Sequence, residues 1–241
     1  MATAIQVRES DVTIESGGDV LPAFFALPQR TGPVPGAMMV HDIFGLRDLA
    51  RGQARRLAAH GVAAVYPHLF RGIGPVDPGV DPEAGKATRP FVDAITVEQC
   101  MGDIEAGLDF LRSQPEVDPD RLIIWGYCWG GAMVLRGANR VPGLAGVVVW
   151  HGILKGEDLA EMDNAVGPIL GLFGDADSSI PVSDVEVLQA RCEVAGVETD
   201  FHLFPDAPHS FCDDTRPTAF NAEACKHAWK EVGRFIRERV G

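Results

Sequence analysis

The chain has 241 residues, 46% of them hydrophobic, and a formal net charge of −13. Its length fits one large α/β domain or two small ones, and because no internal repeat or composition break marks a second domain, we expect one domain covering residues 1–241. Its acidic balance argues against nucleic acid or an anionic membrane as a partner, since both attract clustered Lys and Arg. No stretch reaches the roughly 20 apolar residues of a membrane span, and the first residues lack the basic and apolar regions of a secretory signal.

The N-terminal part of the chain predicts strands. Residues 12–14 and 21–27 flank the pair Gly17-Gly18, a turn signal, and this pattern is typical of an antiparallel hairpin. Three further elements are predicted: a buried strand at 37–40, a helix at 46–60 and a second buried strand at 62–66.

Residues 69–95 contain four prolines and four glycines and show little periodicity, so we predict a long loop over the sheet edge. Thr96 and Gln99 then have the spacing of a capping box, and apolar residues at helical spacing follow them. A helix is therefore expected after Thr96.

The second half of the chain alternates between strand and helix patterns. The predicted strands are residues 122–125, 144–150, 168–173 and 199–204, and the predicted helices follow residue 128 or cover 182–195 and 219–240. This alternation predicts an α/β fold with a mainly parallel sheet and helices on both of its faces.

The five cysteines show no CxxC pair: Cys100, Cys128, Cys192, Cys212 and Cys225. Their odd number and scattered spacing favour reduced thiols in a cytoplasmic protein over a disulfide framework or a zinc site. We also find no Rossmann glycine signature and no P-loop, so we expect no cofactor and no metal. We expect a monomer or a weak homodimer.

Reactive side chains follow three of the predicted strands. Gly126-Tyr127-Cys128-Trp129-Gly130-Gly131 has the pattern of a nucleophile elbow, with cysteine at the apex instead of serine. Asp175 and Asp177 follow the next strand but one, and His209 lies in a late loop. Ligand sites in such sheets form beyond the carboxyl ends of the strands, and the order nucleophile, acid, base is that of an α/β-hydrolase.

Each predicted role has a chemical reason. An imidazole can hold a cysteine as thiolate, and an acid bonded to that imidazole fixes its tautomer. We favour Asp177 as the acid because its loop can turn toward the site, and Asp175 remains the competitor. His209 is the preferred base among seven histidines. The other six precede the acid or lie within a predicted strand or helix: His41, His60, His68, His151, His202 and His227.

Several of these segments together resemble the dienelactone hydrolase family over nearly the whole chain. They are the cysteine elbow, His41-Asp42-Ile43-Phe44-Gly45, Tyr66-Pro67-His68-Leu69-Phe70 and Pro208-His209-Ser210-Phe211. The resemblance implies an α/β-hydrolase fold with a triad of Cys128, His209 and Asp177. It also implies oxyanion donors in the backbone N–H groups of Ile43 and Trp129. Asp42 stands where the family has a carboxylate, usually glutamate, that contacts the nucleophile's sulfur.

The sequence departs from the family pattern after the histidine. Dienelactone enzymes have an arginine there that binds the substrate carboxylate, whereas acids, Asp213 and Asp214, follow His209 here. We therefore expect neutral activated esters or lactones to react at least as well as a carboxylated dienelactone. Arg71, Lys86 and Arg89 are the candidates for a compensating cation over the site.

The cysteine itself restricts the substrate class. A thiolate, whose parent thiol has a pKa of about 8.5, leaves a tetrahedral intermediate more readily than a simple alkoxide does. A cysteine enzyme therefore suits activated esters and enol-lactones, whose leaving groups are better. We interpret the chain as a hydrolase of such small molecules. The alternative is a thiol protein that senses electrophiles or redox state on a hydrolase scaffold.

Overall fold

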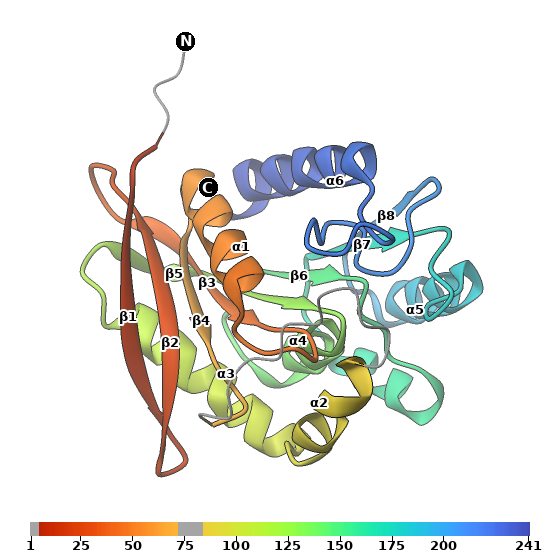
Figure 1. The fold of residues 1–241 in the computed structure, drawn as a ribbon, viewed down its shortest axis with the longest axis horizontal. Helices are drawn as coiled ribbons and strands as arrows, with labels where there is room; N and C mark the ends of the chain where they lie inside the picture. The colour runs from red at the N-terminus through yellow and green to blue at the C-terminus, as the bar shows by residue number, and fades with distance from the viewer. Residues whose placement is uncertain (1–4, 72–83) are drawn as a thin grey trace.

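The computed structural model describes residues 5–71 and 84–241. In this part of the chain, eight strands form one sheet in the order β1-β2-β4-β3-β5-β6-β7-β8 (Figure 1). The strands are β1 Val7–Ser16, β2 Asp19–Pro28, β3 Val34–Val40, β4 Ala63–Pro67, β5 Val117–Tyr127, β6 Gly146–Trp150, β7 Ile169–Gly174 and β8 Thr199–Phe204. The α-helices are α1 Asp48–Ala59, α2 Ala84–Asp93, α3 Val97–Arg112, α4 Trp129–Arg140, α5 Val182–Ala195 and α6 Ala222–Phe235.

The sheet is antiparallel at its N-terminal edge and parallel elsewhere. β1 and β2 form the predicted hairpin, and Gly17 and Gly18 make its turn at φ of 58° and 90°, where a side chain would be strained. β2 also pairs antiparallel with β4, and all strands from β4 to β8 run parallel. The prediction of a mainly parallel sheet with an N-terminal antiparallel hairpin is confirmed.

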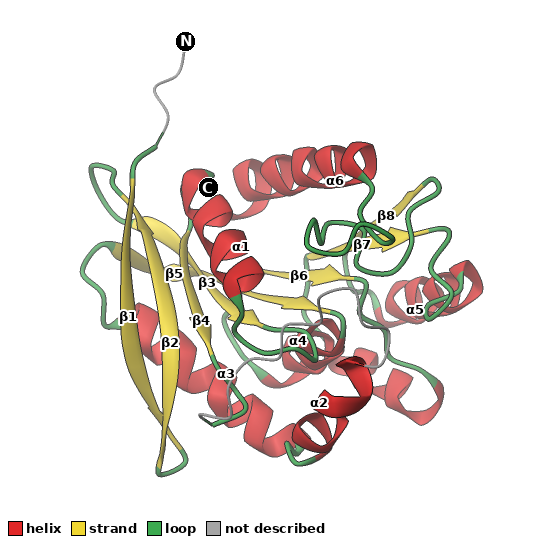
Figure 2. Cartoon of the chain, viewed as in Figure 1, coloured by secondary structure: helices red, strands yellow, loops and turns green. Residues whose placement is uncertain are grey.

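Helices cover both faces of the sheet (Figure 2). α1 and α6 pack on one face, where Trp125, Trp150 and Trp229 form an aromatic layer with ring centroids 5.6 to 6.1 Å apart. α3, α4 and α5 pack on the other face over aliphatic side chains. Because both faces are buried, the central strands carry nearly continuous apolar runs, which made them visible in the sequence.

The structure differs from the prediction of one long loop at 69–95. α2 occupies 84–93 of this range, and residues 72–83 lie outside the described residues. Pro90 lies inside α2, and because proline usually ends a helix, the sequence pattern did not predict a helix here. Phe91 and the nearly buried Val92 hold α2 against the molecule. A 3₁₀ helix at Gly156–Asn164 was not predicted either.

The other predicted strands and helices are present, with shifted ends. The helix expected at 219–240, for example, is α6 followed by a π-helical turn at Ile236–Val240. Thr96 caps α3 as predicted, and its side chain accepts a hydrogen bond from Gln99 N–H at 3.1 Å. Within 5–71 and 84–241, no helix is both long and apolar enough to cross a membrane.

The prediction of five reduced thiols is wrong. Cys212 and Cys225 form a disulfide, while Cys100, Cys128 and Cys192 are free. The two bonded residues are 13 positions apart in the sequence. They meet because the chain after β8 folds back onto α6, and no local sequence pattern predicts this fold-back. The disulfide ties the loop after His209 to α6. It also removes the argument for a cytoplasmic location that rested on reduced thiols.

Candidate active site

Cys128 occupies a sharp turn between β5 and α4. Its φ is 54° and its ψ −115°, a backbone conformation that is costly for a residue with a side chain and that often marks functional sites. The Cys128 N–H donates to the Trp150 carbonyl at 2.9 Å, which fixes the turn to the neighbouring strand β6. The side chain therefore stands at the carboxyl edge of the sheet.

Glycines make this turn possible because four backbone segments meet there. A Cβ on Gly126 would lie 2.2 Å from the Gly130 carbonyl oxygen, inside contact distance. A Cβ on Gly130 would lie 2.4 Å from the Val40 carbonyl oxygen, and one on Gly131 would lie 2.8 Å from the Gly152 Cα. The glycines of the elbow are thus required for β5, α4 and the chain after β3 to approach one another.

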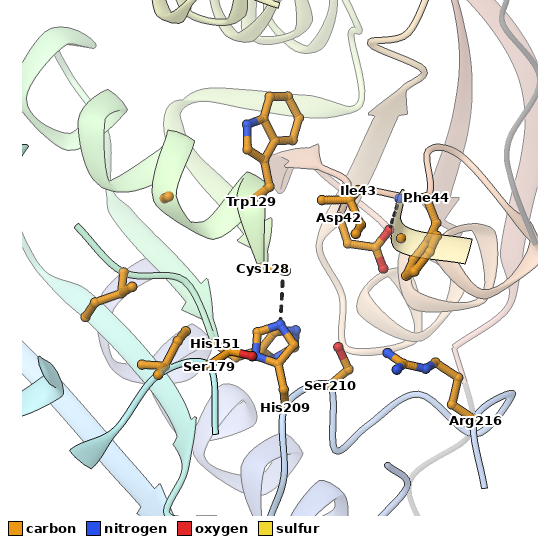
Figure 3. Close-up of a pocket in the computed structure, with 14 residues that line it drawn as sticks. Asp42, Ile43, Phe44, Cys128, Trp129, His151, Ser179, His209, Ser210 and Arg216 are labelled. Carbon is orange, nitrogen blue, oxygen red and sulfur yellow. Dashed lines mark hydrogen bonds between the residues drawn. The ribbon is translucent and has the colours of Figure 1, made fainter. Parts of the chain in front are cut away.

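His209 lies between the cysteine and Asp177, and Figure 3 shows its contact with the cysteine. Its Nε2 is 3.1 Å from the Cys128 Sγ, and its Nδ1 is 2.6 Å from Asp177 Oδ2. The other oxygen of Asp177 accepts the N–H groups of Ser179 and Ile180 at 2.8 and 3.0 Å, which orients the carboxylate. Asp175, the competing acid, is exposed. The structure thus brings together the three side chains that the sequence singled out.

Cys128, His209 and Asp177 form a hydrogen-bonded row in which His209 and Asp177 each favour the charged form of the other. Burial disfavours a charged imidazole at His209, but the hydrogen bonds to Asp177 and Cys128 outweigh it and raise the pKa of His209 to about 10. Burial likewise opposes a charged Asp177, yet the hydrogen bond from His209 lowers the pKa of this carboxyl below its ordinary value. At neutral pH the arrangement therefore favours an imidazolium between a carboxylate and the sulfur.

Two residues that line the pocket of Cys128 are the predicted oxyanion donors, Ile43 and Trp129. Trp129 is the first residue of α4, so its N–H has no acceptor within the helix and lies at the positive end of the helix dipole. Ile43 lies in the loop between β3 and α1, and its side chain and that of Trp129 line the same pocket as Cys128 (Figure 3). That the backbone N–H groups of Ile43 and Trp129 bind an oxyanion stays a prediction.

A neutral histidine holds the Ile43 loop. Burial lowers the pKa of His41 to about 3, so this ring is uncharged at neutral pH. Its Nε2 accepts the Leu69 N–H at 3.0 Å, and its Nδ1 donates to the Asp42 carbonyl at 2.6 Å. The conformation of the loop is thereby tied to the end of β4.

Asp42 lines the pocket, but its carboxylate is engaged by other partners. One oxygen accepts the Phe44 N–H at 2.8 Å, and the other is 3.2 Å from Arg47 Nη2. Burial raises the pKa of Asp42, and the positive charge of Arg47 opposes this rise. The contact between Asp42 and the cysteine sulfur stays a prediction.

Arg47 also binds the loop after His209. Its Nη2 lies 2.7 Å from Asp213 Oδ2, and its Nη1 donates to Thr215 Oγ1 at 3.1 Å. Asp213 is only 4% exposed, so it is not the surface acid that the sequence suggested. The chain turns after Asp213, because Asp213 accepts the backbone N–H groups of Thr215 and Arg216. This turn places Arg216 in the wall of the active-site pocket (Figure 3).

The expectation that no cation follows the histidine is therefore wrong. Sequence reasoning considered only the acids directly after His209, whereas Asp213 begins a turn of the kind that aspartate favours, and Arg216 comes just beyond it. The cations proposed instead do not line the pocket. Arg71 pairs with Asp19 and Asp103, Arg89 pairs with Asp93, and Lys86 lies on α2, from which Gly85 contributes to the pocket wall.

His151 is a second residue that sequence reasoning missed. It follows β6 directly, as Cys128 follows β5, but the chain-order rule excluded it because it precedes the acid. Its ring centroid lies 4.7 Å from that of His209, it is buried, and it lines the pocket. Burial lowers the pKa of His151 well below its ordinary value, so this imidazole is neutral.

The pocket above Cys128 has a volume of about 450 Å³. Its apolar wall is formed by Ile43, Phe44, Trp129, Ile153 and Ile180. Ser179, Ser210 and Arg216 add polar groups at its edge. An apolar pocket of this size with a few polar groups suits a small organic molecule. The residues that the structure describes contain no cluster of His, Cys, Asp or Glu that could hold a metal ion.

The fold and the nucleophile elbow are those of an α/β-hydrolase. The model of the dienelactone hydrolase family matches residues 21–240, so the chain belongs to that family and is a hydrolase of its type. A "Putative carboxymethylenebutenolidase" of Methylorubrum extorquens is 33% identical over 236 residues, covering 95% of this chain and 80% of that protein. One with the same name in Escherichia coli K12 is 32% identical over 240 residues, with coverages of 95% and 86%.

A solved structure with a similar fold supports the assignment to this family. The crystal structure named as a putative dienelactone hydrolase from Klebsiella pneumoniae superposes with a TM-score of 0.87 at 28% identity. The match covers 97% of this chain and 99% of that chain. The comparison supports the mainly parallel sheet and its antiparallel edge as the family's fold.

We predict that Gly130→Ala disrupts the elbow. The added Cβ would collide with the Val40 and His41 carbonyl oxygens at 2.4 and 2.5 Å, so the turn must shift, at a cost of about 1–3 kcal/mol in the free energy of unfolding. Esterase activity should fall more steeply than stability does. Gly102→Ala is the matched control, since its Cβ meets nothing within 4 Å and its helix α3 should be unchanged or more stable. Equal activity in the two variants would contradict the close-approach argument.

We further predict that iodoacetamide alkylates Cys128 faster than Cys100 and Cys192 at neutral pH, because an imidazolium stabilises the thiolate. Asp177→Asn removes a hydrogen bond that raises the pKa of His209, so the imidazolium is lost at lower pH than in the wild type. The alkylation rate at about pH 8 should then fall roughly tenfold, a loss of ~1.4 kcal/mol, as followed by mass spectrometry. Asp175→Asn is the control, and an equal effect of both substitutions would rule out the assigned hydrogen bond.

Proposed function

We propose that the protein hydrolyses activated carboxylic esters or enol-lactones through a triad of Cys128, His209 and Asp177 and an acyl-enzyme intermediate. The observation that carries this proposal is the position of His209, 3.1 Å from the sulfur and 2.6 Å from the carboxylate. Such a row supplies a nucleophile, a proton carrier and an orienting acid in one hydrogen-bonded chain.

In the acylation step, the Cys128 thiolate attacks the substrate carbonyl carbon and forms the C–S bond. The negative charge that develops on the carbonyl oxygen is stabilised by the backbone N–H groups of Ile43 and Trp129. The bond from the carbonyl carbon to the leaving oxygen then breaks, and the proton on His209 Nε2 passes to that oxygen. His209 is left neutral beside a thioester.

In the deacylation step, a water molecule attacks the thioester carbon and gives a proton to the neutral His209. The C–S bond breaks, the carboxylic acid leaves, and the thiolate faces an imidazolium again. Asp177 keeps the imidazole in the required tautomer through both steps. The leaving group decides the efficiency, because a thiolate is expelled far more readily than a simple alkoxide, whereas an enolate or a phenolate, with a parent pKa of about 10 for a phenol, competes with it much more closely.

The position of Arg216 favours a substrate that carries a carboxylate. It lines the apolar pocket, and its guanidinium can pair with a carboxylate through two parallel hydrogen bonds. The names of the relatives, carboxymethylenebutenolidases, agree with a carboxylated lactone. We therefore propose that such anionic enol-lactones are preferred over neutral esters, which reverses the preference expected from the sequence.

We predict that Cys128→Ala and His209→Ala each reduce the hydrolysis of p-nitrophenyl acetate by about 10³-fold or more, and that the double variant loses no more than either single one. Members of a triad act as a unit, so their losses do not multiply. Steady-state kinetics with thermal unfolding as a check on folding measures this. Multiplicative losses would contradict the triad, and unchanged turnover in Cys128→Ala would favour the electrophile-sensing alternative.

We predict that Arg216→Gln lowers kcat/KM for a carboxylated enol-lactone by about tenfold or more, in line with the ~1.5–3 kcal/mol of a hydrogen bond to a charged group. The value for p-nitrophenyl acetate should change by less than about twofold, because a neutral substrate gains little from the charge. Arg8→Gln on β1 removes a positive charge far from the pocket and is the control. Equal losses with both substrates would assign Arg216 a structural role instead.

A further inference from the structure

A narrow cavity adjoins the active-site pocket, beside the loop that carries His209. About 10 Å³ of it is open to the centre of a water molecule, roughly the space of a single water. Asp42, His151 and Ser210 line both this cavity and the active-site pocket. The cavity therefore adjoins the pocket on the inner side of the catalytic histidine.

The same cavity adjoins a wider hollow on the opposite side. This rear hollow has a volume of about 390 Å³, and its walls come from α1, from Trp229 of α6 and from the chain around Cys212. Leu49, Gln53, Tyr127 and Cys212 line both the cavity and the rear hollow. Pocket, cavity and rear hollow thus share lining residues in a row that runs from Cys128 to the face covered by α1 and α6.

The walls of the cavity suit water. Among the residues that the structure describes, the buried His151 Nδ1 has no hydrogen-bond partner, and the buried Tyr127 hydroxyl has none beyond the indole N–H of Trp125. A buried polar atom without a partner is costly, and a water molecule in a cavity with several polar neighbours removes that cost. Asp42 and Asp213 add carboxylates to the same walls. The width excludes anything much larger than water.

The proposed reaction needs a second path for water when the substrate is a lactone. When an open-chain ester acylates Cys128, its alcohol leaves and clears the mouth of the pocket. When a lactone acylates Cys128, its leaving oxygen stays attached to the acyl chain, so nothing departs and the chain still fills the mouth. The water that hydrolyses the thioester must then reach it by another path.

We propose that the row of cavities is a rear water passage, in which water from the rear hollow passes Tyr127 and His151 to reach the acyl-enzyme at His209. The proposal rests on the proposed function. His151 is the last polar group before the triad, with its ring 4.7 Å from that of His209 (Figure 3). The arriving water attacks the thioester carbon, one of its protons goes to His209 Nε2, and the C–S bond breaks to release the thiolate.

The test is to narrow the passage at its rear end with Leu49→Trp, which touches neither the triad nor the oxyanion donors. Leu203→Trp, on the exposed side of β8, is the matched control. The two substrates are dihydrocoumarin, a neutral lactone, and p-nitrophenyl acetate, an open-chain ester. We expect Leu49→Trp to lower kcat for the lactone by roughly tenfold and for the ester by less than about twofold, where tenfold in rate is ~1.4 kcal/mol.

Intact-protein mass spectrometry during lactone turnover should show acyl-enzyme accumulating in Leu49→Trp and not in Leu203→Trp, because only deacylation needs the passage. Tyr127→Phe keeps the ring and removes the hydroxyl, so it provides a second variant that should fold; its lactone kcat should fall in the same direction without a loss of thermal stability. Equal losses for lactone and ester, or no loss in either variant, would overturn the passage. Unchanged turnover of both substrates in Cys128→Ala would instead overturn the proposed function.

Discussion

A buried guanidinium connects the two loops on which the site depends. Arg47 reaches Asp42 in the loop that presents Ile43 and reaches Asp213 in the loop that presents His209 and Arg216. A buried ion pair of this kind adds little net stability, because desolvation offsets the attraction, but the loss of one partner leaves a buried charge and costs about 3–5 kcal/mol. Its effect is therefore to fix geometry. The loop with Ile43 and the loop with His209 cannot move apart without leaving Arg47 or one of its two carboxylate partners unpaired.

The backbone at Cys128 imposes the second constraint. Its positive φ is maintained because the Cys128 N–H is bonded to β6 and because three glycines let α4, β5 and the chain after β3 come into contact. Close-packed backbone of this kind does not deform gradually, so the sulfur stays at one position relative to the sheet. The histidine is brought to that position by a loop held at two points beyond it, by Arg47 at Asp213 and by the disulfide at Cys212.

Much of this arrangement could be predicted from the sequence, and three of the features that could not be predicted have one cause. The parallel strands carry continuous apolar runs, and Cys128, Asp177 and His209 each follow such a run at the edge where sites form, so local pattern and chain order were sufficient. Arg216, the burial of Asp213 and the Cys212–Cys225 disulfide all depend on how the chain after His209 turns back onto α1 and α6, which is a tertiary property. α2 was hidden by its own Pro90, and His151 by a chain-order rule that selects the base but is silent about its neighbours.

The two imidazoles at the centre of the site show how their surroundings divide their roles. His209 and His151 have ring centroids 4.7 Å apart, yet one pKa is raised and the other lowered. His209 gains a carboxylate and the sulfur as partners, whereas burial dominates at His151 and the charge of His209 adds to its effect. Two adjacent imidazolium ions would repel each other in this low-dielectric setting, so the proton stays on His209. His151 therefore remains a neutral hydrogen-bonding group, which can orient a water molecule beside the base without competing for its proton.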